Sequence, residues 1–162
     1  RLAICLKKIT HSTVRLAELN DTSELVERTT EANKESNYGL GYNNDNAFKY
    51  LYNYIKYEDS DILVAEKDDE IIGFVMMGKS FEFHDKPFGY ISKFWVFASG
   101  RRTDAGRNLI SNALKWAKEQ DCSHLFVTAT AELAEKEQQL FINLMKKSGL
   151  VERGPVLSLK ME

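Results

Sequence analysis

The segment from Phe94 to Leu114 constrains this chain most, because an aromatic, β-branched strand runs directly into a basic turn and then a helix. A strand that ends where a helix begins leaves several backbone N–H groups without partners, and the helix dipole adds positive potential there. Such a junction is suited to binding phosphate groups. Arg101, Arg102 and Arg107 lie in this turn, and three arginines favour a polyphosphate over a single carboxylate. The alternative is a capped surface helix with solvated arginines.

The turn reads Arg101-Arg102-Thr103-Asp104-Ala105-Gly106. It resembles the signature Q/R-x-x-G-x-G/A of the GCN5-related N-acetyltransferases, the GNAT superfamily, and Val96 and Leu109 lie where that family places apolar residues. Asp104 stands where the family usually has its first glycine. Asp tolerates a positive φ better than most residues, and we expect its carboxylate to cap the helix and not to face the phosphates. We expect Gly106 to let the backbone approach a phosphate closely.

The composition is that of an ordinary globular protein. The 162 residues fit one domain, with 43% hydrophobic residues, 28% charged residues and a formal charge of -2 that gives no reason to expect nucleic-acid binding. Two cysteines make no disulfide framework, which favours a reduced, cytoplasmic setting. No apolar run has the length needed to span a bilayer, so we expect no membrane partner. We expect residues 1–12 to be a leader or N-terminal extension, and residues 13–162 to form the domain.

Hydrophobic periodicity predicts the order strand, two helices, three strands, helix, strand, helix, strand. The predicted strands span 13–17, 62–66, 71–77, 88–97, 125–130 and 156–160, and the predicted helices span 23–36, 47–57, 104–120 and a stretch ending near 147. We therefore expect a single α/β domain, in which helices flank one mixed, mostly antiparallel sheet. This is also the GNAT order of elements, and the resemblance covers about residues 13–160. The hairpin phrase at 64–74 and the helix end at 144–150, closed by a C-cap at Gly149, match the family as well.

The resemblance implies acetyl-CoA as co-substrate, with no metal, and direct transfer to an amine on a small molecule, peptide or protein. It also implies that the pantetheine arm pairs with the strand before the turn, where the Val96 amide polarises the thioester carbonyl. The residues expected to bind the coenzyme are Phe94, Trp95, Val96, Phe97, Arg101, Arg102, Thr103, Asp104, Ala105, Gly106 and Arg107.

The chain departs from the family in how it would handle protons. Family members with a catalytic carboxylate on this strand carry it a few residues before the valine, where this chain has Tyr90-Ile91-Ser92-Lys93 and no acid. Strict alternation would place Tyr90 and Ser92 on the same face as Val96, so both are candidates for a proton relay through water. Glu82 and His84 are the nearest candidates for a base; the alternatives are a solvated hairpin residue and a turn histidine.

Met145 occupies the position at which the family usually has a tyrosine that protonates the leaving thiolate, four residues before Gly149. Water or a hydroxyl such as that of Ser148 would have to take this role. Core packing is the preferred interpretation of Met145.

Six tyrosines lie in the two-helix insert that forms the acceptor side in this family: Tyr38, Tyr42, Tyr50, Tyr52, Tyr54 and Tyr57. Their rings, together with the carboxylates of Glu58, Asp59 and Asp61, would suit a cationic amine, although aromatic residues at helical spacing usually only pack. The three histidines have no ligand-like spacing with each other or with a cysteine, so we expect no metal site.

Two hypotheses about function remain. The first is an acetyl-CoA-dependent N-acetyltransferase, favoured by the nearly intact segment 101–107, which we call the phosphate turn. The second is a CoA-binding or regulatory module of the same fold with weak or no catalysis, favoured by the missing tyrosine and carboxylate. A nucleotide-phosphate binder of another kind would need a base-recognition feature, and the sequence shows none. The sequence leaves a homodimer open.

Overall fold

The protein is described here by a computed structural model, which describes residues 11–35, 41–127 and 135–152. One five-stranded sheet runs in chain order through β1 (Thr13–Leu16), β2 (Ser60–Lys67), β3 (Glu70–Ser80), β4 (Phe88–Val96) and β5 (Leu125–Val127). The helices are α1 (Thr22–Glu35), α2 (Asn44–Lys56), α3 (Ala105–Glu119) and α4 (Glu135–Lys147), and a 3-10 turn (Leu19–Asp21) precedes α1. Among the described strands, only the pairing of β4 with β5 is parallel. The expected α/β fold with a mostly antiparallel sheet is confirmed, while the strand predicted at 156–160 lies outside the described residues.

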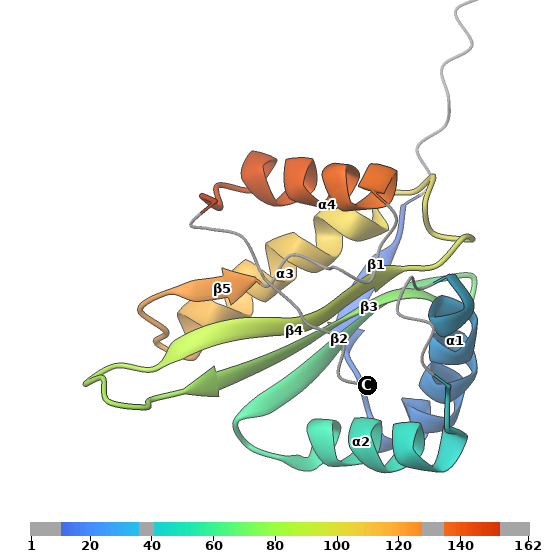
Figure 1. Ribbon diagram of the computed structural model, residues 1–162, viewed down its shortest axis with the longest axis horizontal. Coiled ribbons are helices and arrows are strands. Elements are labelled where there is room, and N and C mark those ends of the chain that lie inside the picture. Colours follow the sequence, from blue (N-terminus) through green and yellow to red (C-terminus); the bar gives the residue numbers. More distant parts are fainter. Residues whose placement is uncertain (1–10, 36–40, 128–134, 153–162) are drawn as a thin grey trace, which may run out of the picture.

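Helices cover both faces of the sheet (Figure 1). On β2, Ile62 and Val64 join the hydrophobic cluster under α1 and α2, whereas Leu63 and Ala65 join the cluster under α3 and α4. Side chains of a strand alternate between faces, so a strand buried on both sides carries an unbroken apolar run. None of the helices in the described ranges is long and apolar enough to cross a membrane.

The turn between β2 and β3 is set by two aspartates. Asp68 and Asp69 have positive φ angles of 53° and 61°, and consecutive positive values are typical of the tight hairpin turn whose twist matches that of the flanking strands. The hairpin predicted from Lys67 to Glu70 is confirmed. Gly149 also has a positive φ, 93°, and ends α4, as expected of a C-cap glycine.

A β-bulge interrupts β4. Met76 pairs with Lys93 but Met77 pairs with Ile91, so Ser92 is an extra residue in the ladder. Ile91 and Val96 are five positions apart, an odd number that would place them on opposite faces of a regular strand. Because of the bulge, both pack toward α3 and α4, and Ser92 contacts α2 on the other face. The expectation that Tyr90 and Ser92 share a face with Val96 is wrong, because the bulge reverses the alternation between them.

Candidate functional site

Among the described residues, the last part of β4 has one backbone edge without a strand partner. Phe97 and Ile72 form a hydrogen-bonded pair, with the Phe97 N–H donating to the Ile72 carbonyl at 3.0 Å. Backbone groups of an antiparallel strand alternate in direction, so the N–H and C=O groups of Phe94 and Val96 point away from β3. Within the described ranges, β5 pairs only with Gly89–Ile91 and does not extend along this edge. The end of β4 therefore offers a strand-like ladder to an extended ligand.

The turn after β4 depends on Gly100, which lies outside the expected signature. A Cβ built on Gly100 would lie 2.4 Å from the Ile72 carbonyl oxygen and 2.9 Å from a Val96 methyl group. Only glycine lets the chain pass this close to β3. The Gly100 carbonyl accepts hydrogen bonds from the amide (3.0 Å) and the hydroxyl (2.7 Å) of Thr103. A glycine four residues beyond Val96 was the available signal in the sequence.

The first turn of α3 is capped by Thr103, whose hydroxyl oxygen accepts from the Ala105 N–H at 3.1 Å. The expectation that the Asp104 side chain caps this helix is wrong, since it makes no capping hydrogen bond. The Asp104 backbone has φ −85° and ψ 5°, whereas a capping side chain normally belongs to an extended residue. Within the described part of the chain, the N–H groups of Gly106 and Arg107 have no acceptor and are available to an anion.

The Asp104 carboxylate turns toward the start of β1. Its Oδ1 accepts from the Ser12 N–H at 2.8 Å and the Ser12 hydroxyl at 2.7 Å, and its Oδ2 lies 3.2 Å from Nδ1 of His11. The Asn108 side-chain amide also donates hydrogen bonds to Ser12, one to its backbone carbonyl and one to its hydroxyl oxygen. Burial alone would raise the pKa of Asp104, but the hydrogen bonds to the charged form outweigh it and hold this pKa at about 2. Ser12, assigned from the sequence to an N-terminal extension, is buried here.

The three arginines have different surroundings. Arg101 donates from Nε to the Val96 carbonyl at 3.3 Å, and its Nη2 forms an ion pair with Glu35 at the end of α1. This guanidinium therefore closes the open edge of β4 at one carbonyl. Arg102 and Arg107 are exposed, in the turn and in the first turn of α3. These two arginines and the helix amides lie at the turn for which the sequence predicts anion binding.

Gly106 lies against α4 as well as at the start of α3. A Cβ on Gly106 would meet a Leu144 methyl at 3.4 Å and a Val96 methyl at 3.7 Å, which are ordinary contact distances. A methyl group at Gly106 would therefore fit between α3, α4 and β4 without displacing these neighbours.

Comparison with known proteins identifies the family. The model of the Acetyltransferase (GNAT) family matches residues 24–142. This chain belongs to the GNAT acetyltransferase family. No curated protein sequence matches it.

Solved structures share the GNAT fold over nearly the whole chain. A ribosomal-protein-alanine N-acetyltransferase from Brucella melitensis biovar Abortus 2308 is 14% identical, with a TM-score of 0.71 over 94% of this chain and 100% of its own. An aminoglycoside acetyltransferase from an uncultured soil metagenomic sample, in complex with sisomicin, is 15% identical, with a TM-score of 0.69 over 93% and 95% of the two chains. AAC(6')-Iy, in complex with the bisubstrate analogue CoA-S-monomethyl-acetylneamine, is 13% identical, with a TM-score of 0.73 over 94% of this chain and 99% of its own.

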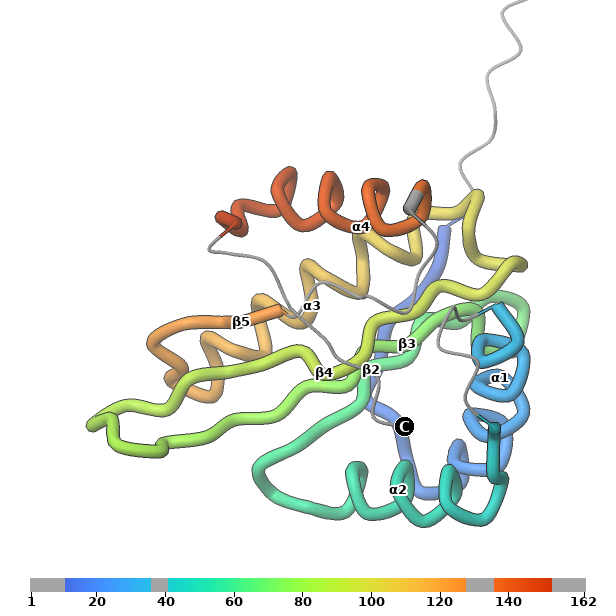
Figure 2. Tube along the Cα trace, viewed as in Figure 1, coloured from blue at the N-terminus to red at the C-terminus, as the bar shows by residue number. Residues whose placement is uncertain are grey.

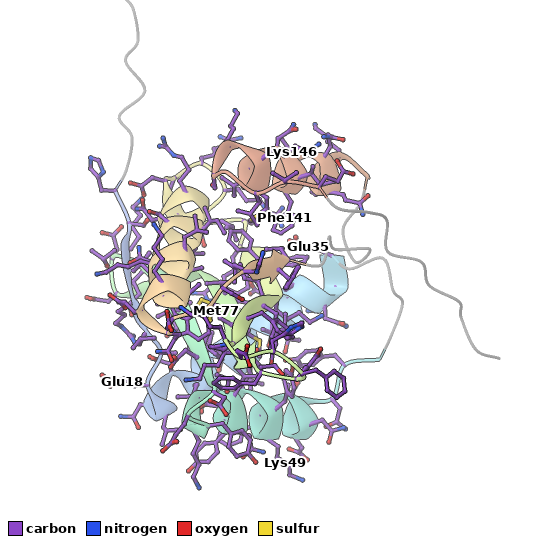
Figure 3. All side chains as sticks on the ribbon, turned by 90° about the vertical axis from the view of Figure 1, so that its left-hand side faces the viewer. Glu18, Glu35, Lys49, Met77, Phe141 and Lys146 are labelled. Carbon is purple, nitrogen blue, oxygen red and sulfur yellow. The ribbon has the colours of Figure 1, made fainter. Side chains whose placement is uncertain are left out.

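The position of the usual GNAT tyrosine lies in the core of this protein. Met145 is buried in one cluster with Phe94 and Phe141, whose rings are 5.3 Å apart. Figure 3 shows Phe141 on the side of α4 that faces the sheet. The packing interpretation of Met145 is confirmed. The Ser148 hydroxyl donates to the Leu144 carbonyl at 2.9 Å, so its hydrogen is engaged within the helix end.

The two candidates for a base lie far from Val96. Glu82 and His84 are exposed in the loop between β3 and β4, and Glu82 has a positive φ of 44°. This loop projects from the end of the sheet opposite the turn before α3 (Figure 2). β4 spans Phe88–Val96, and a strand rises about 3.3 Å per residue, so roughly 26 Å separates its ends. The fold does not bring these two side chains to the Val96 amide.

Tyr90 and Ser92 lie on the face that α1 and α2 cover. The Ser92 hydroxyl is 2.9 Å from the hydroxyl of Tyr54 in α2, and the Tyr90 ring lies directly over Gly78, where a Cβ would come within 2.4 Å of its hydroxyl. Burial raises the pKa of Tyr54, and the neighbouring Tyr90 adds to the rise. The phenol of Tyr54 therefore stays protonated near neutral pH.

Two of the three carboxylates expected to attract a cationic amine already have partners. Asp59 lies 3.5 Å from the ammonium of Lys79, and Asp61 accepts from the Trp116 indole N–H at 2.6 Å. Glu58 is exposed. Most of the charge that the sequence suggested for an acceptor site is thus engaged in holding α3 and β3 to the start of β2.

Proposed function

We propose that this protein is an N-acetyltransferase that moves the acetyl group of acetyl-CoA directly to an amine. The observation that carries the proposal is the junction of β4 and α3. There the outward amides of Phe94 and Val96 continue into helix amides that have no acceptor among the described residues, and into two exposed arginines. The amides of Phe94 and Val96 suit the amide groups of a pantetheine arm, and the helix amides with the two arginines suit a pyrophosphate.

In this arrangement the Val96 N–H donates to the thioester carbonyl oxygen. Attack by a neutral amine forms the N–C bond and places negative charge on that oxygen, which the Val96 amide stabilises. Collapse of the adduct breaks the C–S bond and releases the thiolate. Since Glu82 and His84 lie at the far end of β4 and Met145 cannot donate a proton, the amine arrives deprotonated and water carries the protons.

The acceptor is proposed as an amine on a small molecule, a peptide or a protein. Structural relatives carry names that refer to a ribosomal-protein alanine and to aminoglycosides, and both groups act on amines. We also propose a cytoplasmic location, because the two cysteines form no disulfide framework. The second candidate function, a CoA-binding module without efficient catalysis, is favoured by Met145 at the position of the usual tyrosine.

Two measurements test the proposal. Calorimetry should show CoA binding that Arg107→Glu weakens at least tenfold, because a charge-assisted hydrogen bond is worth roughly 1.5–3 kcal/mol. Lys115→Glu is the matched control, since it makes the same charge change at an exposed site later in α3. Thiol release from acetyl-CoA is then measured with sisomicin, spermidine, n-butylamine and a peptide that has an alanine N-terminus.

Equal CoA affinity for wild type and Arg107→Glu would remove the coenzyme site from this turn. Tight CoA binding without thiol release for any amine would support the non-catalytic module instead.

A further inference from the structure

The start of β1 is tied to the phosphate turn by one buried carboxylate. Asp104 accepts hydrogen bonds from the Ser12 N–H at 2.8 Å and from the Ser12 hydroxyl at 2.7 Å, and both residues are buried. The Asn108 side-chain amide donates to the same hydroxyl oxygen at 3.1 Å. The start of β1 lies beside the start of α3 (Figure 1), although 92 residues separate Ser12 from Asp104. The direction of the Asp104 side chain is therefore set by β1 and not by its own helix.

Asp104 occupies the N-cap position of α3. A carboxylate at an N-cap ordinarily accepts a hydrogen bond from the second or third amide of its own helix. In α3 these are the amides of Gly106 and Arg107, which have no acceptor within the described ranges. They belong to the helix amides that the proposed function assigns to the pyrophosphate. An Asp104 side chain that capped α3 in the ordinary way would thus occupy groups that the coenzyme needs.

The contacts with Ser12 remove this competition. The Asp104 side chain makes no hydrogen bond to α3, and its backbone, with φ −85° and ψ 5°, is not in the extended conformation of a capping residue. Thr103 caps the Ala105 amide instead. The hydrogen bonds to the carboxylate outweigh its burial and hold the pKa of Asp104 at about 2. The side chain is therefore ionised at neutral pH, and a released carboxylate would be attracted to the positive end of the helix dipole.

We propose that Ser12 is a positioning residue for the coenzyme: it holds Asp104 against β1, prevents this side chain from capping α3 and so keeps the helix amides open to phosphate. The inference rests on the proposed binding of CoA at the phosphate turn. It makes the start of β1 part of the coenzyme site, without any contact between Ser12 and the coenzyme. It also accounts for an aspartate at the position where the GNAT signature has its first glycine.

Removal of the Ser12 hydroxyl tests the proposal. In Ser12→Ala the carboxylate keeps the backbone N–H and His11 as partners but loses its shortest hydrogen bond, and we expect it to cap α3 for part of the time. A side-chain cap is worth about 1 kcal/mol, which is roughly fivefold in an equilibrium constant. Because CoA must displace this cap, its Kd, measured by calorimetry, should rise roughly three- to fivefold.

Ser60→Ala is the matched control. Ser60 is also a buried serine, and its hydroxyl donates to the Tyr54 carbonyl at 2.7 Å, away from the phosphate turn. The substitution removes one buried serine hydroxyl, as Ser12→Ala does, and we expect it to leave the Kd for CoA unchanged.

A second substitution separates the positioning role from a purely structural one. In the Asp104→Gly background no carboxylate can cap α3, so the additional change Ser12→Ala should alter the Kd by less than about 1.5-fold. Amide hydrogen exchange gives a readout without ligand. In Ser12→Ala the Gly106 or the Arg107 amide should exchange roughly fivefold more slowly than in wild type, whereas Ser60→Ala should leave both rates unchanged.

A Kd for Ser12→Ala within about twofold of the wild-type value, or a loss of affinity that persists in the Asp104→Gly background, overturns this inference and leaves the proposed function standing. Unchanged exchange of both amides in Ser12→Ala overturns it as well. Wild-type protein that does not bind CoA overturns the proposed function together with the inference.

Discussion

Replacing Asp104 with asparagine tests the contact between the phosphate turn and the start of β1. The carboxylate accepts two hydrogen bonds from Ser12 and lies beside His11, and its side chain is 11% exposed. Asp104→Asn keeps the shape and one acceptor oxygen but removes the charge. A carboxylate that is buried and hydrogen-bonded stabilises the folded state only while it is ionised.

The pKa of Asp104 sets the size of the effect. It falls from 3.8 to about 2 on folding, and at about 1.36 kcal/mol per pKa unit this difference corresponds to at most about 2.4 kcal/mol. The His11 side chain is 87% exposed, so solvent screens its interaction with Asp104. We therefore expect Asp104→Asn to lower the free energy of unfolding at pH 7 by about 1–2 kcal/mol. Because the folded pKa is the lower one, this stability is present above pH 3.8 and is lost as pH falls through about 2. Roughly half of it should remain at pH 3.

Urea unfolding measures this contribution, with fluorescence of the two buried tryptophans, Trp95 and Trp116, as the signal. The free energy of unfolding is compared for wild type and Asp104→Asn at pH 7 and pH 3. Asp85→Asn, at an exposed site in the loop between β3 and β4, is the control and should be nearly neutral. A loss below about 0.5 kcal/mol at pH 7, or an equal loss at both pH values, would refute the reasoning.

Three further results are expected. Gly100→Ala should lower the free energy of unfolding by roughly 2 kcal/mol or more, because the new methyl group meets the Ile72 carbonyl oxygen at 2.4 Å. The control Gly41→Ala places a methyl group with nothing within 4 Å and should leave stability unchanged. A thermal unfolding midpoint for Gly100→Ala equal to that of wild type would contradict this reasoning. Met145→Leu should change the free energy of urea unfolding by less than about 1.5 kcal/mol, because it keeps the core volume, and a larger loss would show that Met145 does more than fill space. Turnover, measured by thiol release, should rise with pH toward the pKa of the acceptor amine without a falling limb below pH 9, and a bell-shaped profile would show that a titrating side chain transfers the proton.

Much of the fold could be predicted because its signals are local. The change from helical to strand spacing after Asp59, the aspartates of the β2–β3 turn and Gly149 each act within a few residues, and all appear in the structure. The junction of β4 and α3, where we predict a phosphate site, could be located for the same reason, since a strand ending at a basic helix start is contiguous in the chain. The limits of most elements differ from the predicted ones by one to three residues, as expected where helices fray and ladders end gradually.

The contacts of this region that the sequence did not predict join distant parts of the chain. Asp104 accepts hydrogen bonds from Ser12, 92 residues away, and Arg101 forms an ion pair with Glu35, 66 residues away. Neither partner carries a local pattern, because an ion pair depends on where two side chains meet in space. The bulge at Ser92 has the same origin, since β3 determines which β4 residue is left over.

The sequence by itself determined the order of elements, the apolar faces of strands and helices and the place of the strand–helix junction at which we predict anion binding. These features follow from periodicity and from backbone groups left unpaired where a strand meets a helix. Only the tertiary structure decided that Thr103 caps α3, that Asp104 holds the start of β1 and that Ser92 faces Tyr54 while Val96 faces α4. Side-chain direction at these positions depends on the register between strands and on which distant groups compete for each hydrogen bond. Neither quantity is encoded by any single stretch of the chain.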